Sequence, residues 1–424
     1  MDKQKTLKCI SYSAMAVLIV SMMAATVLER IYGTDFALRW VYHNPVFIAL
    51  WAVTAVAGIW FLLERGGARR PCTLLLHGAF VLILAGALVT HLTGKSGMIH
   101  LREGEPATAF ELDEGGSATL PFSLELKAFR IEYDPGTRNI SDYISELTVR
   151  PSGPSGRHSG RILSLSKDDP ESSSVTISMN HIYKRDGYRF YQADYDEDGL
   201  GSILAVSRDP WGVGITYAGY LLLLVAMLGY FFQKDTTYDE ARRAIRARRT
   251  PGRGRRTAVI VLAVAGVALL VLWLLDAFPK GPLMPVLRSP LLFIHMIPIM
   301  VSYALFGVLA ILGIIGLLLP KERSERLRDV CITMLCPAVF LLTFGTFLGA
   351  VWANISWGNY WAWDPKETWA LVTLLVYSFP LHGRALKAFG RPRFFHAFLL
   401  AAFLCVLVTY FGVNMLLGGM HSYA

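Results

Sequence analysis

The sequence predicts a polytopic α-helical membrane protein with a small water-facing domain rich in β-strands. Of its 424 residues, 54% are hydrophobic and 17% are charged, whereas soluble chains carry about 25% charged residues. Apolar runs recur along the chain, and about 20 apolar residues are enough for one helix to cross a bilayer. Residues 93–210 interrupt this pattern, because charge rises there and long apolar runs vanish.

About nine apolar runs are candidate transmembrane helices. The shortest is expected to gain a turn at each end. Lys and Arg concentrate in the segments assigned to the cytoplasmic side, and this bias places the N-terminus inside and the C-terminus outside. The runs cover about residues 10–28, 46–63, 73–92, 211–232, 257–275, 295–319, 329–351, 369–381 and 394–412.

Residues 1–92 form the first predicted unit and hold three of these spans. The first run has the length of a signal peptide, but Leu28-Glu29-Arg30 lacks the small-x-small pattern of a cleavage site. We therefore expect a retained membrane anchor.

Residues 93–210 are expected to form an extracytoplasmic β-rich domain inserted between the third and fourth spans. The segments F-S-L-E-L-K (122–127) and I-S-E-L-T-V (144–149) alternate with the period of two that is typical of half-exposed strands. Asp134-Pro135-Gly136 and the Pro-, Ser- and Gly-rich run 151–156 predict turns. A domain of this size can bury a modest core of its own.

A fourth span at 211–232 leads to the most basic segment, 233–256, which we interpret as a solvated cytoplasmic linker that sets orientation. The last unit, 257–424, contains the remaining spans. The net charge of +9 lies largely in such inner segments and argues against nucleic-acid binding. No P-loop or dinucleotide-binding glycine motif occurs. None of the five Cys residues forms a C-x-x-C pair, so the sequence contains no visible zinc site or dithiol redox centre.

The stretch W-A-N-I-S-W-G-N-Y-W-A-W-D-P-K-E-T-W (352–369) holds five of the ten Trp residues and is expected at the outer face. Trp residues at a membrane surface usually form an anchoring belt. Their density here, together with Gly358, favours a binding platform instead. Trp357 and Trp361 are four residues apart and would share one face if the segment were helical.

The same stretch carries a compact charge cluster of Asp364, Lys366 and Glu367. Lys366 could reach a carboxylate of a bound ligand, or it could pair with one of its two acidic neighbours. The sequence leaves both readings open.

Four histidines fall into two pairs by their expected depth in the membrane. His295 lies at the outer end of its span and His421 in the outer C-terminal tail, at the level of the Trp-rich stretch. His77 and His382 both lie near the inner ends of spans, in different halves of the chain. A membrane-embedded His needs a partner, and two imidazoles on facing helices suit a six-coordinate haem iron.

A lone His inside a membrane is more often a hydrogen-bonded packing residue, so the prediction rests on the pairing by depth. His43 and His91 are expected at the outer face with no pair assigned, and His396 is expected to reach the inner interface.

Several motifs resemble haem-handling membrane proteins of cytochrome c maturation. The segment W-G-N-Y-W-A-W-D-P-K-E-T-W is similar to the WWD-type motif, and its P-K-E-T-W ending resembles the CcsA branch. Residues 289–306 and 411–423 are also similar to CcsA. H-G-A-F-V-L-I-L-A-G-A (77–87), D-G-Y-R-F-Y-Q-A-D-Y-D (186–196) and D-P-W-G-V-G-I-T-Y-A-G-Y (209–220) resemble CcsB (ResB). The whole chain therefore resembles a CcsB–CcsA fusion, the system II cytochrome c synthase, with an outer domain shorter than in many fusions.

This resemblance implies an enzyme, a holocytochrome c synthase or cytochrome c haem lyase, in the bacterial cytoplasmic (inner) membrane. Haem b would be carried to the periplasmic face and joined to the C-x-x-C-H motif of apocytochrome c. His295 and His421 would be the outer axial ligands, and His77 and His382 the ligands of the membrane site. The implied haem platform consists of Trp357, Gly358, Trp361, Trp363 and Asp364.

The implied partners are haem, apocytochrome c, the lipid bilayer and, because this chain lacks C-x-x-C, a separate thioredoxin-like thiol reductant. Asp364 is the nearest candidate for an acid or base. Two alternatives use the same histidines: a haem transporter without ligation activity, and a quinol-linked membrane haem b redox protein.

Overall fold

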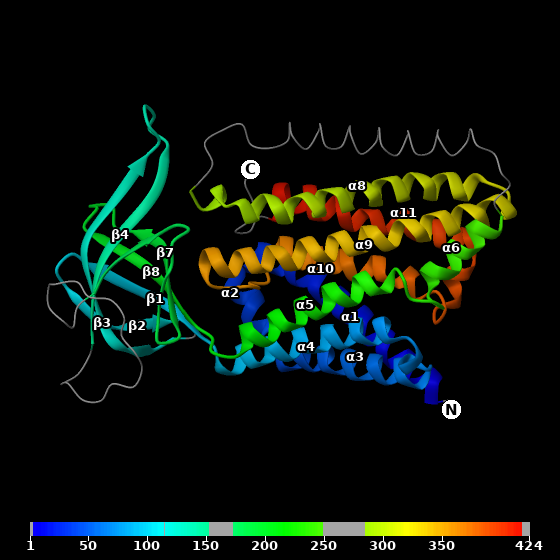
Figure 1. Cartoon of the computed structure of the whole chain (residues 1–424), viewed down its shortest axis with the longest axis horizontal. Helices are drawn as coiled ribbons and strands as arrows, with labels where there is room; N and C mark the ends of the chain where they lie inside the picture. Colours follow the sequence, from blue (N-terminus) through cyan, green and yellow to red (C-terminus); the bar gives the residue numbers. More distant parts are fainter. Residues whose placement is uncertain (1–2, 114, 152–172, 249–284, 418–424) are drawn as a thin grey trace.

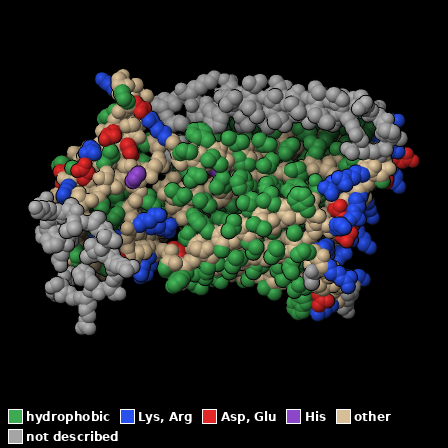
Figure 2. All heavy atoms as spheres, in the orientation of Figure 1, with side chains coloured by type: hydrophobic (Ala, Val, Ile, Leu, Met, Phe, Trp, Pro, Cys, Tyr) green, Lys and Arg blue, Asp and Glu red, His purple; other side chains and the backbone are tan. Residues whose placement is uncertain are grey.

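The computed structural model describes residues 3–113, 115–151, 173–248 and 285–417. A long body of roughly side-by-side helices carries the β-rich domain at one end, and the N-terminus lies at the opposite end (Figure 1). The space-filling view shows an apolar surface along the helical body, with Lys and Arg gathered at the end farthest from the β-rich domain (Figure 2). This distribution is typical of a protein that spans a membrane.

Among the described residues, seven helices are long and apolar enough to cross a membrane. They correspond to seven of the nine predicted spans. Their bounds are α1 (Lys3–Tyr32), α3 (Pro45–Glu64), α4 (Pro71–Thr93), α5 (Gly212–Tyr230), α8 (Pro290–Leu318), α9 (Lys321–Trp357) and α11 (Pro392–Leu407), the last of which continues as the π-helical η6 (Val408–Leu417).

The two other predicted spans have different outcomes. The expected span 369–381 corresponds to α10 (Pro365–Ser378), which has 14 residues and continues as the short 3₁₀ helix η4 (Phe379–His382). The expected span 257–275 lies outside the described residues. The count of nine spans and their orientation therefore stay predictions.

Short helical segments connect the long ones. On the β-rich side, α2 and η1 join α1 to α3, and η3 precedes α8. Near the opposite end are η2, η5 and α6. Their bounds are α2 (Thr34–Ala37), η1 (Leu38–Tyr42), η2 (Gly67–Arg69), α6 (Thr237–Ala247), η3 (Pro285–Arg288) and η5 (Lys387–Gly390).

The basic segment is more ordered, over its described part, than the predicted solvated linker. Residues 237–247 form α6, which begins where the Thr236 hydroxyl accepts a hydrogen bond from the Asp239 amide at 3.1 Å. Ala241 is buried against α9, and Arg248 forms an ion pair of 3.0 Å with Asp329 of that helix. The many charges of this segment predict a solvated run, but they leave a narrow apolar face, with Ala241 on it, by which the helix packs.

The two halves of the chain share one helical core. Leu18 and Met22 of α1 are fully buried in a cluster that also contains Trp369 and Val372 of α10. The Trp369 indole donates a hydrogen bond to the Thr26 hydroxyl at 3.1 Å. The first helix is therefore an integral part of the membrane body, on which α10 packs directly.

The middle of the chain folds into one antiparallel sheet of eight strands, in the order β5-β4-β3-β2-β1-β8-β7-β6. The two segments that alternate in the sequence lie in the paired strands β3 and β4, so the β-rich prediction is confirmed. The strands are β1 (Lys95–Arg102), β2 (Pro106–Leu112), β3 (Ser117–Tyr133), β4 (Ile140–Pro151), β5 (Ser173–Ser178), β6 (Tyr183–Arg185), β7 (Tyr188–Tyr195) and β8 (Gly201–Arg208).

Alternation along β3 builds the core of this domain. Leu120, Phe122, Leu124 and Leu126 are buried, while residues between them are more exposed. The predicted turn at Asp134-Pro135-Gly136 joins β3 to β4, with Gly136 in the left-handed region. Most of the predicted turn 151–156 lies outside the described residues.

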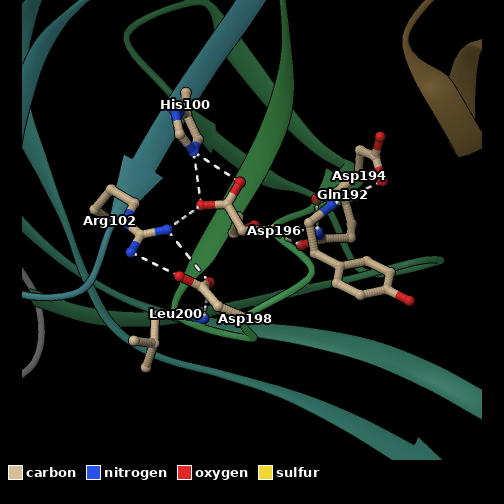
Figure 3. Close-up of polar contacts among 9 residues, drawn as sticks. His100, Arg102, Gln192, Asp194, Asp196, Asp198 and Leu200 are labelled. Atoms are coloured by element: carbon tan, nitrogen blue, oxygen red, sulfur yellow. Dashed lines mark hydrogen bonds and ion pairs between the residues drawn. The ribbon is translucent and has the colours of Figure 1, made fainter.

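A polar cluster fastens the β7–β8 turn to strand β1 (Figure 3). The Asp196 carboxylate accepts hydrogen bonds from His100 Nε2 at 2.9 Å and from Arg102 Nη1 at 2.6 Å. Arg102 Nη2 also donates to Asp198 at 2.8 Å. These contacts hold the pKa of Asp196 below its usual value, chiefly through the hydrogen bonds from His100 and Arg102. The pKa of Asp198 is also lowered, first by the hydrogen bond from the Leu200 backbone amide and second by the one from Arg102.

The β-rich domain rests on the end of α9 through strands β7 and β8. Arg189 Nη1 donates to Asn354 Oδ1 at 3.0 Å, and the Tyr191 hydroxyl donates to the Asn354 carbonyl at 3.1 Å. The Ser207 hydroxyl donates to the Gly358 carbonyl at 3.2 Å. Gly358 has φ +83°, and a Cβ added there would lie 2.5 Å from the Tyr191 ring. Only glycine fits this position without strain.

A second contact joins the β3–β4 turn to η3, the short helix that precedes α8. Arg288 makes a bidentate ion pair with Asp134, with distances of 2.8 and 2.7 Å. The domain is thus tied to α9 and to the segment that leads into α8.

Replacing Asp196 with Asn is expected to lower the stability of the β-rich domain at pH 7. Because the pKa of Asp196 is depressed from its ordinary value of 3.8, its stabilising contribution is full above that value and is lost as the pH falls through the depressed pKa. Thermal unfolding of wild type and variant, followed at pH 7 and then at falling pH, should show two melting curves that converge in acid. The exposed Asp113→Asn is the control and should match wild type at every pH.

Replacing Gly358 with Ala is expected to destabilise the junction by about 1–3 kcal/mol, because the left-handed backbone and the Tyr191 ring both oppose a Cβ. The melting temperature of the purified full chain measures this effect. Gly214→Ala is the matched control, since a Cβ at Gly214 meets no atom within 4 Å. Equal melting temperatures for the two variants would contradict the steric argument.

Candidate functional site

The Trp-rich stretch 352–369 is a helix end, a loop and a helix start, so it is not continuously helical. Helix α9 ends at Trp357 because Gly358 takes up the left-handed conformation that terminates helices. Helix α10 begins at Pro365. Trp361 is therefore not on the same helix as Trp357, and the condition for the predicted shared face is not met. The four-residue spacing predicts a shared face only within a continuous helix, and here the helix ends before Gly358.

The five Trp residues lie in three different surroundings. The Trp352 ring packs edge-on against Trp357 at 4.7 Å between centroids. The Trp363 ring stacks on Tyr42 of η1 at 4.6 Å and contacts Trp361 edge-on at 5.8 Å. Trp369 is buried between α1 and α10. Trp363 has φ +58°, which is uncommon for a bulky residue and marks a strained backbone.

Asp364 is the cap of helix α10. Its Oδ1 accepts a hydrogen bond from the Lys366 amide at 2.8 Å, and the residue is buried. Glu367 Oε2 accepts from the Ala362 amide at 2.9 Å and so folds the loop back onto α10. Both carboxylates therefore shape the loop. The role of Asp364 as an acid or base stays a prediction.

The loop is also fixed to the N-terminal half of the chain. The Tyr360 hydroxyl donates to Thr90 Oγ1 of α4 at 3.0 Å, and Thr90 in turn donates to Asp209 at 2.6 Å. Together with the stacking of Trp363 on Tyr42, these contacts place the loop between the two halves of the molecule.

His77 of α4 and His382 of η4 lie face to edge, with 5.8 Å between their ring centroids. Each Nδ1 is 2.8 Å from the backbone carbonyl four residues earlier, on Thr73 and Ser378 respectively. Since a carbonyl can only accept, each Nδ1 carries the proton and each Nε2 has the lone pair that a metal ion requires. Through these two Nε2 atoms the pair would hold the iron of a haem, as the sequence predicts.

His295 of α8 shows the same backbone bond, with its Nδ1 3.0 Å from the Leu291 carbonyl. Its ring stacks on Trp352 at 5.4 Å. Gly349 of α9 lets this ring approach, because a Cβ there would lie 3.0 Å from His295 Cδ2. The expected partner, His421, lies outside the described residues, so the outer pair stays a prediction.

His43 and His91 form a pair that the sequence reasoning missed. Their ring centroids are 5.4 Å apart, and both side chains are exposed beside the loop that carries Tyr360 and Trp363. The preceding residues, Tyr42 and Thr90, make the loop contacts described above. The predicted depth places both histidines at the same membrane face. The sequence does not show which helices are neighbours, so it does not predict that the two rings meet.

The expectation that His396 reaches the interface is wrong. This residue is fully buried, and its Nε2 donates to the Ser324 carbonyl at 3.1 Å. Its ring fills the space over Gly316, where a Cβ would lie 2.5 Å from the imidazole. His396 is therefore a hydrogen-bonded packing residue.

Comparison with known proteins identifies both halves of the chain. Residues 49–208 match the ResB-like family, and residues 245–421 match the cytochrome C assembly protein family. Protein NrfI of Wolinella succinogenes is 41% identical over 155 residues, which are 34% of this chain and 17% of NrfI. The cytochrome c biogenesis protein CcsA of Chlamydomonas reinhardtii is 39% identical over 155 residues, 34% of this chain and 43% of that protein.

A third relative, the CcsA protein of Pyropia yezoensis, is 32% identical over 216 residues, 39% of this chain and 66% of its own length. The chain thus spans between 17% and 66% of the length of these three relatives. With a ResB-like part and a cytochrome c assembly part in one polypeptide, the chain belongs to the cytochrome c biogenesis proteins and has the organisation of a CcsB–CcsA fusion of system II.

Proposed function

We propose that this chain carries haem b across the bacterial cytoplasmic membrane and attaches it to the C-x-x-C-H motif of apocytochrome c on the outer face. The family supports a role in cytochrome c maturation. The single observation that carries the finer proposal is the His77–His382 pair, at 5.8 Å between ring centroids. One of these residues comes from the ResB-like part and the other from the cytochrome c assembly part.

In this proposal His77 and His382 receive the haem iron near the inner end of the membrane body. The orientation is supported by the concentration of Lys and Arg at that end (Figure 2). Both imidazoles are held by backbone carbonyls on the neighbouring turn, so little side-chain freedom remains to be lost on binding iron.

At the outer end, His295 and His421 are proposed to ligate the iron beside the Trp-rich loop. Support comes from the His295 ring, which already stacks on Trp352 and is fixed through Nδ1. Trp357, Gly358, Trp361, Trp363 and Asp364 are proposed to form the platform, with Gly358 and Asp364 shaping the backbone and the indoles offering flat apolar surface.

Attachment itself is an addition in which no atom leaves. Each cysteine Sγ of the C-x-x-C-H motif bonds to a vinyl carbon of haem, and the thiol hydrogen ends on the adjacent vinyl carbon. The motif histidine replaces one axial imidazole of this chain. The role of the protein is to hold the vinyl edge where the thiols reach it. A separate thioredoxin-like protein is proposed to keep those thiols reduced.

The His77→Ala and His382→Ala variants are each expected to purify with at least about tenfold less haem, because one axial ligand is lost. Haem per protein is measured from the absorption spectrum of the purified full chain. Added imidazole should restore haem to either variant if the role is axial ligation, and it would not repair a folding defect. His181→Ala, in the β-rich domain, is the control. Normal haem content in the two pair variants would remove the inner site from the proposal.

Co-expression with a C-x-x-C-H apocytochrome, in a host without its own maturation system, is expected to yield cytochrome with covalent haem. His295→Ala should lower this yield severalfold while the inner site still holds haem, since only the outer site is altered. Covalent haem is detected by its resistance to acid–acetone extraction. Haem-loaded protein with no covalent product would instead favour a transporter, and redox activity with quinol in the absence of apocytochrome would favour a haem b redox protein.

A further inference from the structure

A cleft of about 420 Å³ opens near the N-terminal end of α1. It is lined by one stripe of that helix and closed by Leu386 from the segment that follows His382. The stripe has the spacing of a single helix face. Its residues are Lys5, Lys8, Cys9, Tyr12, Ser13 and Ala16.

Tyr12 connects this cleft with the inner histidine pair. Its ring lies edge-on to the His382 ring at 6.0 Å between centroids and also contacts Phe379 at 6.1 Å. The cleft is therefore next to the His77–His382 pair, with Tyr12 as the shared wall. Lys8 lies one turn before Tyr12, about 6 Å along the helix axis, and Lys5 lies about 10 Å before it.

Some cations at this end of the molecule are already paired with carboxylates. Lys3 forms an ion pair with Glu64 at 2.7 Å, and Arg384 pairs with Glu240 at 3.4 Å. Within the part of the chain that the structure describes, neither Lys5 nor Lys8 forms an ion pair or a side-chain hydrogen bond. Lys5 and Lys8 thus line one cleft, and the Tyr12 ring separates that cleft from a pair of imidazoles.

We propose that this cleft is the entry subsite for haem, in which Lys5 and Lys8 bind the two propionate carboxylates while the porphyrin edge passes Tyr12 towards His77 and His382. This inference rests on the proposed function, because it needs haem at the inner histidine pair. It adds the site by which the dianionic substrate is recognised from the cytoplasmic side.

Charge and solvation explain why such a subsite is needed. The porphyrin ring is apolar and enters the membrane body readily, but moving a carboxylate out of water without a partner is strongly unfavourable. Lys5 and Lys8, at the opening of the cleft, hold both propionate carboxylates at the water boundary while the porphyrin ring moves deeper into the membrane body. A compact ammonium on a flexible stem suits a substrate that must later be released.

The test is a titration of the haem-free full chain in detergent with haem and with haem dimethyl ester, whose propionates carry no charge. The Soret absorption reports binding to the histidine pair. Lys5→Gln combined with Lys8→Gln is expected to weaken haem binding about tenfold and to leave ester binding unchanged. Lys5→Arg combined with Lys8→Arg should retain most of the affinity for haem.

Removing two positive charges from the N-terminal segment could also alter membrane orientation. A relocation variant separates these effects: Gln4→Lys and Thr6→Lys are added to the double Gln variant. Neither position lines the cleft, so the charge count is restored and the subsite is not. This variant is expected to insert like wild type and to bind haem as weakly as the double Gln variant.

Two results would overturn the inference: unchanged haem affinity in the double Gln variant, or an equal loss for haem and its ester. Its failure is distinguishable from failure of the proposed function. If His77→Ala abolishes the Soret signal while the lysine variants behave as wild type, only the entry subsite is wrong. If His77→Ala binds haem normally, the inner site is wrong as well.

Discussion

A hydrogen bond from an imidazole Nδ1 to the carbonyl four residues earlier recurs at His77, His295 and His382. An imidazole inside a membrane body needs a hydrogen-bond partner. An imidazole that is to bind a metal must also keep the lone pair of its other nitrogen. The backbone carbonyl accepts a hydrogen bond from the protonated Nδ1 and so fixes the orientation of the ring. The other nitrogen keeps its lone pair. His396 shows the contrast, because its Nε2 makes the carbonyl bond and its ring is sealed against Gly316.

The Trp-rich loop is held from several sides by elements that are distant in sequence. Asn354 and Gly358 contact the β-rich domain, Tyr360 contacts α4, and Trp363 stacks on η1. These contacts join the ResB-like part to the cytochrome c assembly part at the loop itself. A β-rich domain that held the apocytochrome would therefore be in direct mechanical contact with the surface proposed to present haem.

Much of the architecture could be read from the sequence, because apolar run length and strand alternation are local signals. Seven spans and the β-rich insertion followed from them. The inner histidine pair also followed, since charge bias fixes depth and depth limits which residues can meet. The His43–His91 pair did not follow, because depth says nothing about which helices are neighbours.

Other errors came from tertiary packing that overrides local patterns. Residues 237–247 are rich in charge, yet α6 buries Ala241. The four-residue spacing of Trp357 and Trp361 suggested one face, yet the left-handed Gly358 separates them.

The inner histidine pair has a consequence for biogenesis of the protein itself. His77 and His382 are separated by more than three hundred positions in the chain, so the pair is complete only when the two halves have docked in the bilayer. Fusion into one polypeptide gives both halves a high effective concentration and a fixed stoichiometry. A chain whose halves failed to dock would lack the proposed iron-binding pair, so an incompletely folded protein would not capture haem at this site.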